Sequence, residues 1–163
     1  MAAKNREDFN SEIVMKKTLT YSDANEFGYV AAGDVARIAE LTAVLLSKSF
    51  CNRRVVTACI DQMIFKRPLR VGDKLVIRAN INYVQKSSME IGVRIEVENK
   101  KTAKAEHVTT AYMVLVAMDE HMKPVQLPAI EPASSEQKRR FEAGRKRMEQ
   151  RAAVRSKSVK DNG

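Results

Sequence analysis

The fold of this chain is decided by the stretch AAGDVARIAELTAVLLSKSF, residues 31–50. Its apolar side chains occupy most of the circumference of a helix, and besides several alanines they include Val35, Ile38, Leu41, Val44, Leu45 and Leu46. A helix that is apolar nearly all round is normally buried inside a protein rather than laid on its surface. The stretch therefore predicts one long central helix that the rest of the chain must cover.

Extended segments flank this helix on both sides and are suited to covering it. Residues 11–20 predict a first strand, and residues 55–65 (VVTACIDQMIF) are rich in the apolar and β-branched residues of a central strand. Residues 74–83 and 88–99 alternate between apolar and polar, which is typical of half-buried antiparallel strands, and residues 104–118 predict a long last strand. We expect an α+β fold in which a five-stranded antiparallel sheet wraps the helix.

The loop before the helix, residues 21–30, carries the first candidate site residues. Asn25 and Gly28 lie in this loop, Gly33 lies at the helix start, and Glu40 follows about two turns further on among apolar neighbours. Poor solvation makes a carboxylate more basic, and backbone N–H groups at a helix start can bind an oxyanion, so this spacing suits catalysis. Ordinary interpretations stay open, because Glu40 could pair with Arg37 and the loop residues could serve only the turn.

The second predicted strand carries further polar side chains. Alternation puts Thr57 and Asp61 on one face of this strand together with Cys59 and Met63. Asp61 either supports a site or is a structural acid with a bonded partner. Cys59 and Cys51, the only cysteines, have neither metal-site nor redox-motif spacing, which indicates two reduced thiols.

The composition of the chain changes within LPAIEPASSEQ, residues 127–137. Pro128 and Pro132 in this stretch indicate a domain boundary. The net charge is +9, and residues 131–163 hold ten Lys or Arg against five Asp or Glu. We predict a basic helix that is capped by Ser135 and ends near Arg151, with disordered residues after it. The expected organisation is an arm at 1–10, one domain at 11–130 and a basic helical tail at 131–163.

Several kinds of function have no support in the sequence. No apolar run approaches the roughly 20 residues of a membrane span, and the chain begins without a signal-peptide pattern, so we expect a cytoplasmic protein. His107 and His121 have no arguable catalytic partner, and no cluster of Cys, His and acids predicts a metal or cofactor site. The basic tail lacks interleaved aromatics, so we expect no specific nucleic-acid binding.

The order of segments and several motifs resemble the hotdog-fold acyl-CoA thioesterases. The resemblance covers roughly residues 11–150 and rests on four pieces. These are the Asn25–Gly28–Gly33–Glu40 spacing, VVTACIDQMIFKRPLRVGD (55–73), QKSSMEIGVRIEVE (85–98) and SSEQKRRFEAGRKR (134–147). The last piece is similar to the basic segment that ends the cytosolic long-chain acyl-CoA hydrolases.

This resemblance implies a hotdog domain that hydrolyses fatty acyl-CoA to free fatty acid and CoA without a cofactor. Glu40 takes the place of a helical Asp and would be the nucleophile or the general base. Asn25 would orient the water or the carbonyl, and helix-start N–H groups at Gly33 would form the oxyanion hole, with Gly28, Thr57 and Asp61 in support. The family further implies a dimer whose sheets join, with active sites between protomers, often assembled as a trimer of dimers.

Coenzyme A carries phosphates, so its site should be basic. The element Lys86, Ser87 and Ser88 matches a family motif and, with Arg67, forms the predicted CoA-binding set. Lys66, Arg53 and Arg54 are further candidates near strand ends.

Three alternatives to hydrolysis remain at the level of sequence. The first is a non-catalytic acyl-CoA-binding module that senses lipid state. The second is nonspecific, salt-sensitive nucleic-acid binding through the basic tail. The third, a hotdog dehydratase, would need a catalytic His on the loop or helix, and neither segment contains one. The replacement of the family's Asp by Glu40 extends the carboxylate by one methylene and leaves open whether it attacks directly or activates water.

Overall fold

The computed structural model describes residues 11–99 and 104–161 of the 163-residue chain, so the predicted arm at 1–10 lies outside the described residues. The elements in chain order are β1 (Glu12–Thr18), a short 3-10 helix η2 (Tyr21–Asp23), α1 (Ala32–Cys51), β2 (Arg54–Ile60), β3 (Lys74–Gln85), β4 (Ser88–Glu98), β5 (Ala105–Met118) and α2 (Ser135–Asp161).

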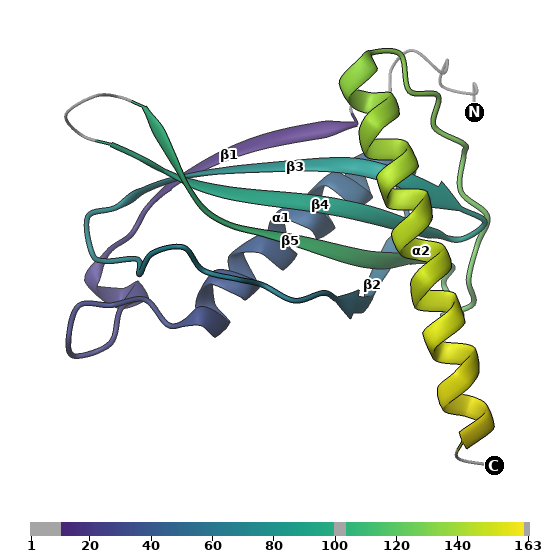
Figure 1. Ribbon diagram of the computed structural model, residues 1–163, viewed down its shortest axis with the longest axis horizontal. Coiled ribbons are helices and arrows are strands. Elements are labelled where there is room, and N and C mark those ends of the chain that lie inside the picture. Colours follow the sequence, from purple (N-terminus) through teal and green to yellow (C-terminus); the bar gives the residue numbers. More distant parts are fainter. Residues whose placement is uncertain (1–10, 100–103, 162–163) are drawn as a thin grey trace.

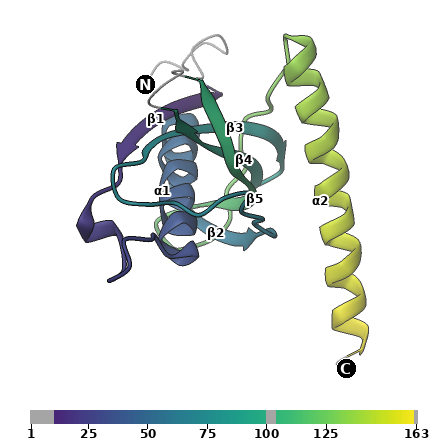
Figure 2. The ribbon, with the colours of Figure 1, turned by 60° about the vertical axis from the view of Figure 1, so that its left-hand side comes forward.

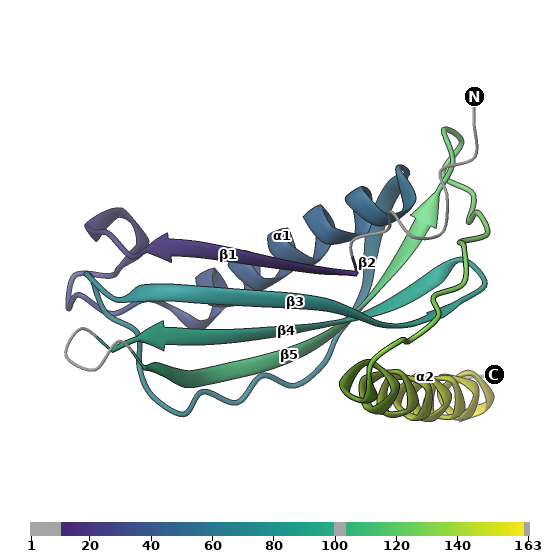
Figure 3. The same cartoon turned by 90° about the horizontal axis from the view of Figure 1, so that it is seen from above.

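The strands form one five-stranded antiparallel sheet with the order β1-β3-β4-β5-β2. α1 lies along one face of the sheet, and α2 lies against the opposite face (Figures 1 and 2). Seen from above, the sheet separates the two helices (Figure 3). The predicted architecture of a central helix wrapped by an antiparallel sheet is confirmed.

The core lies between α1 and the sheet. Val35, Ala39, Ala43, Leu46 and Phe50 are at most 2% exposed, and they pack against buried apolar residues of the strands. The opposite side of α1 leaves Leu41 and Leu45 about half exposed, at 49% and 48%. The expectation of a helix buried all round is therefore wrong for this side in the single chain.

The second strand is shorter than predicted. β2 ends at Ile60, and residues 61–65 follow β5 without a regular ladder, through isolated bonds such as Asp61 N–H to the Tyr112 carbonyl at 2.9 Å. Met63 and Phe65 still pack on the core. The alternation of this segment therefore reflects burial along the sheet edge, and burial alone does not distinguish a strand from an extended edge segment.

A bulge in β2 corrects the prediction that Thr57 and Cys59 share a face. Thr57 lies opposite Leu115, whereas Cys59 lies opposite Val114, because the pairing with β5 shifts between them. Side chains of directly opposed residues point to the same face. Thr57 therefore faces the core side together with the buried Leu115, and Cys59 faces the α2 side.

α2 differs from the predicted tail helix at both ends. Its cap is Ser134 rather than Ser135, because the Gln137 N–H donates to Ser134 Oγ and Gln137 Oε1 accepts the Ser134 N–H in return. The helix continues to Asp161, whereas we expected it to end near Arg151 and to be followed by disorder at 155–163. Ion pairs spaced three and four residues apart, such as Arg145 with Glu142 and Glu149, stabilise the part of this polar helix before Arg151.

No helix in the described part of the chain has both the length and the apolar character that crossing a membrane requires.

Candidate active site

Asn25 organises the loop that leads into α1. Its Oδ1 accepts hydrogen bonds from the N–H groups of Phe27 and Tyr29 at 3.0 and 3.1 Å, and Gly28 takes the positive φ of 76° that the turn needs. The interpretation of Asn25 as a turn residue is therefore confirmed, because its side-chain oxygen stabilises the loop. Its Nδ2 group makes no hydrogen bond with the described residues and lies on an exposed side chain, so it stays available as a donor.

The start of α1 leaves two backbone donors available. Ala31 provides no side-chain cap, and its carbonyl accepts the N–H groups of Asp34 and Val35. The N–H groups of Ala32 and Gly33 find no partner among the described residues. A Cβ built on Gly33 would meet no heavy atom within 4 Å, so the side of Gly33 that a side chain would occupy is open in the single chain.

Glu40 lies half-buried on α1, and its carboxylate forms no hydrogen bond or ion pair with the described residues. Arg37, the expected partner in the ordinary interpretation, instead approaches Asp34, with its Nε 4.0 Å from Oδ1. A local ion pair therefore does not account for Glu40. Its carboxylate is therefore not held by another residue of the described chain and could contact a bound substrate or water.

Glu40 and Gly33 are well separated within one chain. They lie seven positions apart on one helix, which corresponds to about 10 Å between their backbones along its axis. A base and an oxyanion donor must both come within roughly 3 Å of the reacting group. The separation favours a site built from Glu40 of one chain and the helix start of another.

The candidate CoA-binding turn lies at the other end of the sheet. Lys86 and Ser87 connect β3 to β4, whereas the Asn25 loop lies where β1 ends, at the far end of the strands (Figure 1). Lys86 adopts a positive φ of 52°, and Ser88 Oγ donates to the Gln85 carbonyl at 3.1 Å. The Lys86 side chain is exposed and makes no ion pair with the described residues, so its charge is free.

Arg67 differs from Lys86 because its charge is already matched. Its Nη2 donates to Asp73 Oδ2 at 2.9 Å, and its Nη1 donates to Glu106 Oε2 at 3.4 Å. These contacts favour a structural role for Arg67 over the predicted contact with CoA phosphates.

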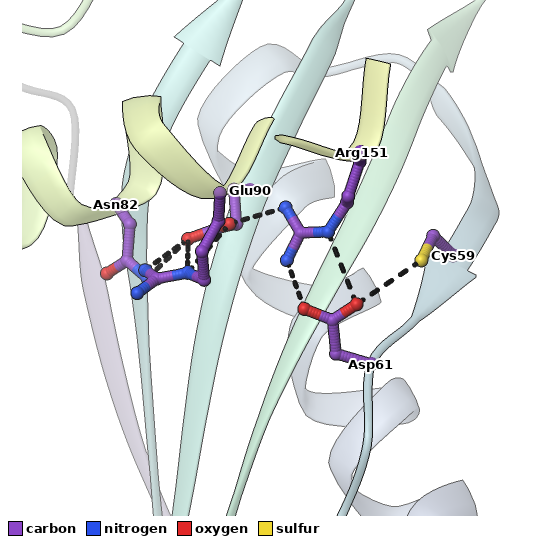
Figure 4. A network of polar contacts seen from close by, with 6 residues as sticks. Cys59, Asp61, Asn82, Glu90 and Arg151 are labelled. Carbon is purple, nitrogen blue, oxygen red and sulfur yellow. Dashed lines mark hydrogen bonds and ion pairs between the residues drawn. The ribbon is translucent and has the colours of Figure 1, made fainter. Parts of the chain in front are cut away.

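Asp61 belongs to a polar cluster that α2 forms with the outer face of the sheet (Figure 4). Glu90 on β4 is completely buried, and Arg147 and Arg151 of α2 each donate to it at 2.6 Å. Arg151 also bonds to Asp61, and the Cys59 thiol donates to Asp61 Oδ1 at 3.7 Å. The Arg151 hydrogen bond lowers the pKa of Asp61 against the raising effect of burial.

This cluster favours the interpretation of Asp61 as a structural acid. Its other charged members are not among the candidate site residues predicted from the sequence; they are Glu90, Arg147 and Arg151. The signal in the sequence is an acid on the polar face of a strand and two arginines one helical turn apart. Because these partners lie far apart along the chain, nothing in the sequence connects them. Thr57 faces the core side of the sheet, and its separation from this cluster follows from the bulge.

The comparisons with known proteins agree on one kind of relative. A family model described as the thioesterase superfamily matches residues 27–104. Protein VdlD of Helicobacter pylori is 31% identical over 153 residues, which are 94% of this chain and 87% of that protein.

Two solved structures resemble the whole chain. A hexameric acyl-CoA thioesterase is 31% identical with a TM-score of 0.79, over 88% of this chain and 94% of that chain. The acyl-CoA hydrolase of Staphylococcus aureus, solved with butyryl-CoA and CoA, is 26% identical with a TM-score of 0.85, over 93% of this chain and 92% of that chain.

Proposed function

Since this chain belongs to the family of hotdog-fold acyl-CoA thioesterases, we propose that it hydrolyses fatty acyl-CoA to free fatty acid and CoA, with Glu40 as the reacting carboxylate. The observation that carries this proposal is the state of Glu40. It is half-buried on the central helix and lacks any partner among the described residues, although Arg37 lies one turn away. No ion pair or hydrogen bond within the described part of the chain therefore accounts for its position.

Two routes satisfy the chemistry. As a general base, Glu40 takes a proton from water while the water oxygen bonds to the thioester carbon. The C–S bond then breaks, and the proton passes to the departing thiolate, which leaves as CoA. As a nucleophile, Glu40 forms an anhydride with the acyl group and releases CoA, and water then hydrolyses the anhydride. Both routes give one fatty acid and one CoA per water consumed.

The open donors at the start of α1 complete the proposed site. The N–H of Gly33 would hold the oxyanion that forms at the carbonyl, and the loss of one such donor typically lowers turnover by about 10²–10³. The free Nδ2 of Asn25 would donate to the water or the carbonyl. Because Gly33 and Glu40 of one chain are about 10 Å apart, the donors come from a second copy of the chain.

A dimer joined through β2 would supply that second copy. β2 is an edge strand of the sheet, and Ile60 and Ile64 at this edge are 44% and 66% exposed. Pairing with a second β2 would cover these side chains and give hydrogen-bond partners to the unpaired N–H and C=O groups of the edge strand. Hexameric structures among the relatives support further assembly into a trimer of dimers. A cytoplasmic location and a fatty acyl substrate stay predictions.

Release of CoA thiol from a panel of acyl-CoAs tests the proposal. Wild type should release thiol, and Glu40→Gln should lower turnover by about 10²–10⁴-fold, because the neutral amide cannot serve as base or nucleophile. Glu142→Gln, which removes an exposed acid on α2, is the control and should retain wild-type turnover.

Two outcomes would contradict the proposal. Full turnover in Glu40→Gln would remove Glu40 from the reaction. Tight acyl-CoA binding without turnover in wild type would favour the alternative of a non-catalytic acyl-CoA-binding module.

A further inference from the structure

A hollow of about 460 Å³ lies at the C-terminal end of α1, away from Glu40 and the Asn25 loop. It is lined chiefly by Lys48, Arg53, Arg54, Met118, Asp119 and Glu120. We call it the basic hollow, because three cationic side chains meet there.

Arg53 and Arg54 stand apart from the other arginines. Among arginines with described side chains, every other one contacts a carboxylate or, for Arg70, the Tyr29 hydroxyl. Arg53, Arg54 and Lys48 have no such partner in the described part of the chain. An anion could therefore bind here without breaking an existing ion pair.

The two acids of the basic hollow offset its three cations only in part and form no ion pair with them in the described part of the chain. Asp119 Oδ1 accepts the N–H groups of His121 and Lys123, each at 2.8 Å, and so is committed to the turn after β5. Glu120 is exposed and forms no ion pair with the described residues. The hollow thus contains three cationic side chains and two acidic ones. Asp119 is hydrogen-bonded within the turn after β5, and Glu120 has no ion-pair partner among the described residues.

The Lys86–Ser88 turn lies near the basic hollow. Ser88 lies opposite Val116 on β5, and Arg54 lies opposite Met118 on the same strand. One strand therefore separates the turn from Arg54, which corresponds to about 10 Å. Along α1, Lys48 lies about 12 Å beyond Glu40. Lys48, Arg54 and Lys86 therefore lie at one end of the molecule, beyond the reacting carboxylate.

We infer that the basic hollow binds the phosphate groups of the acyl-CoA substrate, with Arg53 and Arg54 as their main ligands. The inference rests on the proposed function and assigns its substrate phosphates to residues. The pantetheine arm of CoA separates its phosphates from the thioester, which matches the separation of the hollow from Glu40. Guanidinium groups bind phosphate through paired, charge-assisted hydrogen bonds. Arg67, which two carboxylates already hold, is not one of these ligands.

The test compares two substrates that differ only in phosphate. One is an acyl-CoA, and the other carries the same acyl group on pantetheine, which has no phosphate. For Arg53→Gln/Arg54→Gln, KM for acyl-CoA should rise about tenfold or more with kcat retained, while kcat/KM for the pantetheine thioester should equal that of wild type. The control Lys138→Gln/Lys146→Gln, which removes two exposed charges from α2, should leave KM for acyl-CoA unchanged.

An equal loss on both substrates, or no loss on either, would overturn the inference. If wild type hydrolyses neither substrate, the proposed function fails. The affinity for CoA, measured by calorimetry, then tests whether the basic hollow binds the phosphates of CoA. Weaker CoA binding by Arg53→Gln/Arg54→Gln than by wild type supports it, and equal affinity overturns it.

Discussion

The amide of Asn25 has two ends with different tasks. Oδ1 holds the loop by accepting two backbone N–H groups, whereas Nδ2 faces outward without a partner among the described residues. This division explains how one side chain can be both an ordinary turn residue and a candidate donor to the substrate.

Asn25→Asp separates these two tasks. Aspartate keeps the acceptor that holds the loop but loses the Nδ2 donor, so we expect turnover to fall at least about tenfold with little change in the free energy of unfolding. Acyl-CoA turnover and urea unfolding, measured on the same preparation, check this expectation. Asn25→Ala, the matched variant, should lose turnover and some stability together. Unchanged turnover in Asn25→Asp would show that Asn25 serves only the loop.

At the scale of single residues, the sequence predicts those site residues whose positions depend only on neighbours nearby in the chain. Asn25, Gly33 and Glu40 can be selected because a loop, a helix start and a helical turn are defined by nearby residues. Glu90 cannot be matched to Arg147 in this way, because the ion pair exists only after a strand and the last helix have packed together. The free state of Arg53 and the paired state of Arg67 are likewise consequences of the fold rather than of residue type.

Among the elements, α2 shows how a polar helix is held on a sheet. Few apolar contacts attach it, such as the edge-to-face pair of Tyr83 and Phe141 with ring centres 5.0 Å apart. The main attachment is the buried Glu90, which two arginines of α2 bind. Gly144 allows the close approach, because a Cβ there would lie 3.1 Å from Glu90 Oε1 and from two β3 side chains.

Two arginines on the same helix provide a matched pair for testing this attachment. Arg147→Ala should lower the free energy of unfolding by about 2–4 kcal/mol, because it leaves the buried Glu90 short of a partner. Arg145→Ala removes only exposed pairs with Glu142 and Glu149 and should cost less than about 1 kcal/mol. Urea unfolding of both variants measures the difference. Equal effects would show that the Glu90 cluster does not anchor α2.

The sequence predicts the elements well where periodicity is strict. β3 and β4 form where the alternation predicts them, and their core-facing residues are buried. Asn82 and Glu90 on the other face are buried as well, because α2 packs over them. β2 ends early because burial along the sheet edge imitates a strand, and α2 ends later than its composition predicts. Neither effect is visible in local composition.

For the molecule as a whole, several carboxylates make stability depend on pH. The hydrogen bond from the Thr20 N–H, with the contact to Lys17, lowers the pKa of Asp23 from 3.8 to about 2. For Glu96, burial raises the pKa, but the hydrogen bonds from Arg94 and Arg78 outweigh burial and the pKa is lowered. The pKa of Asp61 is lowered by Arg151.

A lowered carboxylate pKa adds stability that is complete above the unfolded-state pKa and is lost as the pH falls through the folded-state pKa. We therefore expect the free energy of unfolding to begin to fall below about pH 6.5, because burial lowers the pKa of His107, and to fall further from about pH 4.5 to about 2 as the carboxylates are protonated. Urea unfolding at a series of pH values measures this decline. Asp23→Asn should make the decline shallower between about pH 4 and 2, and an identical curve would remove Asp23 from the explanation.

The architecture of one chain follows from the sequence, because one buried helix and alternating strands admit few arrangements. The complete site does not, since Gly33 and Glu40 lie about 10 Å apart on one helix and the proposed site brings the helix start of a second chain to Glu40. That proposal comes from helix geometry together with the positions of the two residues.

Mixing two inactive variants tests this shared site most directly. Glu40→Ala and Asn25→Ala are each expected to release little CoA thiol from acyl-CoA. After the two chains are mixed by co-expression or joint refolding, half of the dimers contain one chain of each kind, and each of these holds one intact site. Thiol release should therefore recover to about a quarter of the wild-type rate. A mixture no more active than its separate components would contradict a site built from Glu40 of one chain and Asn25 of another.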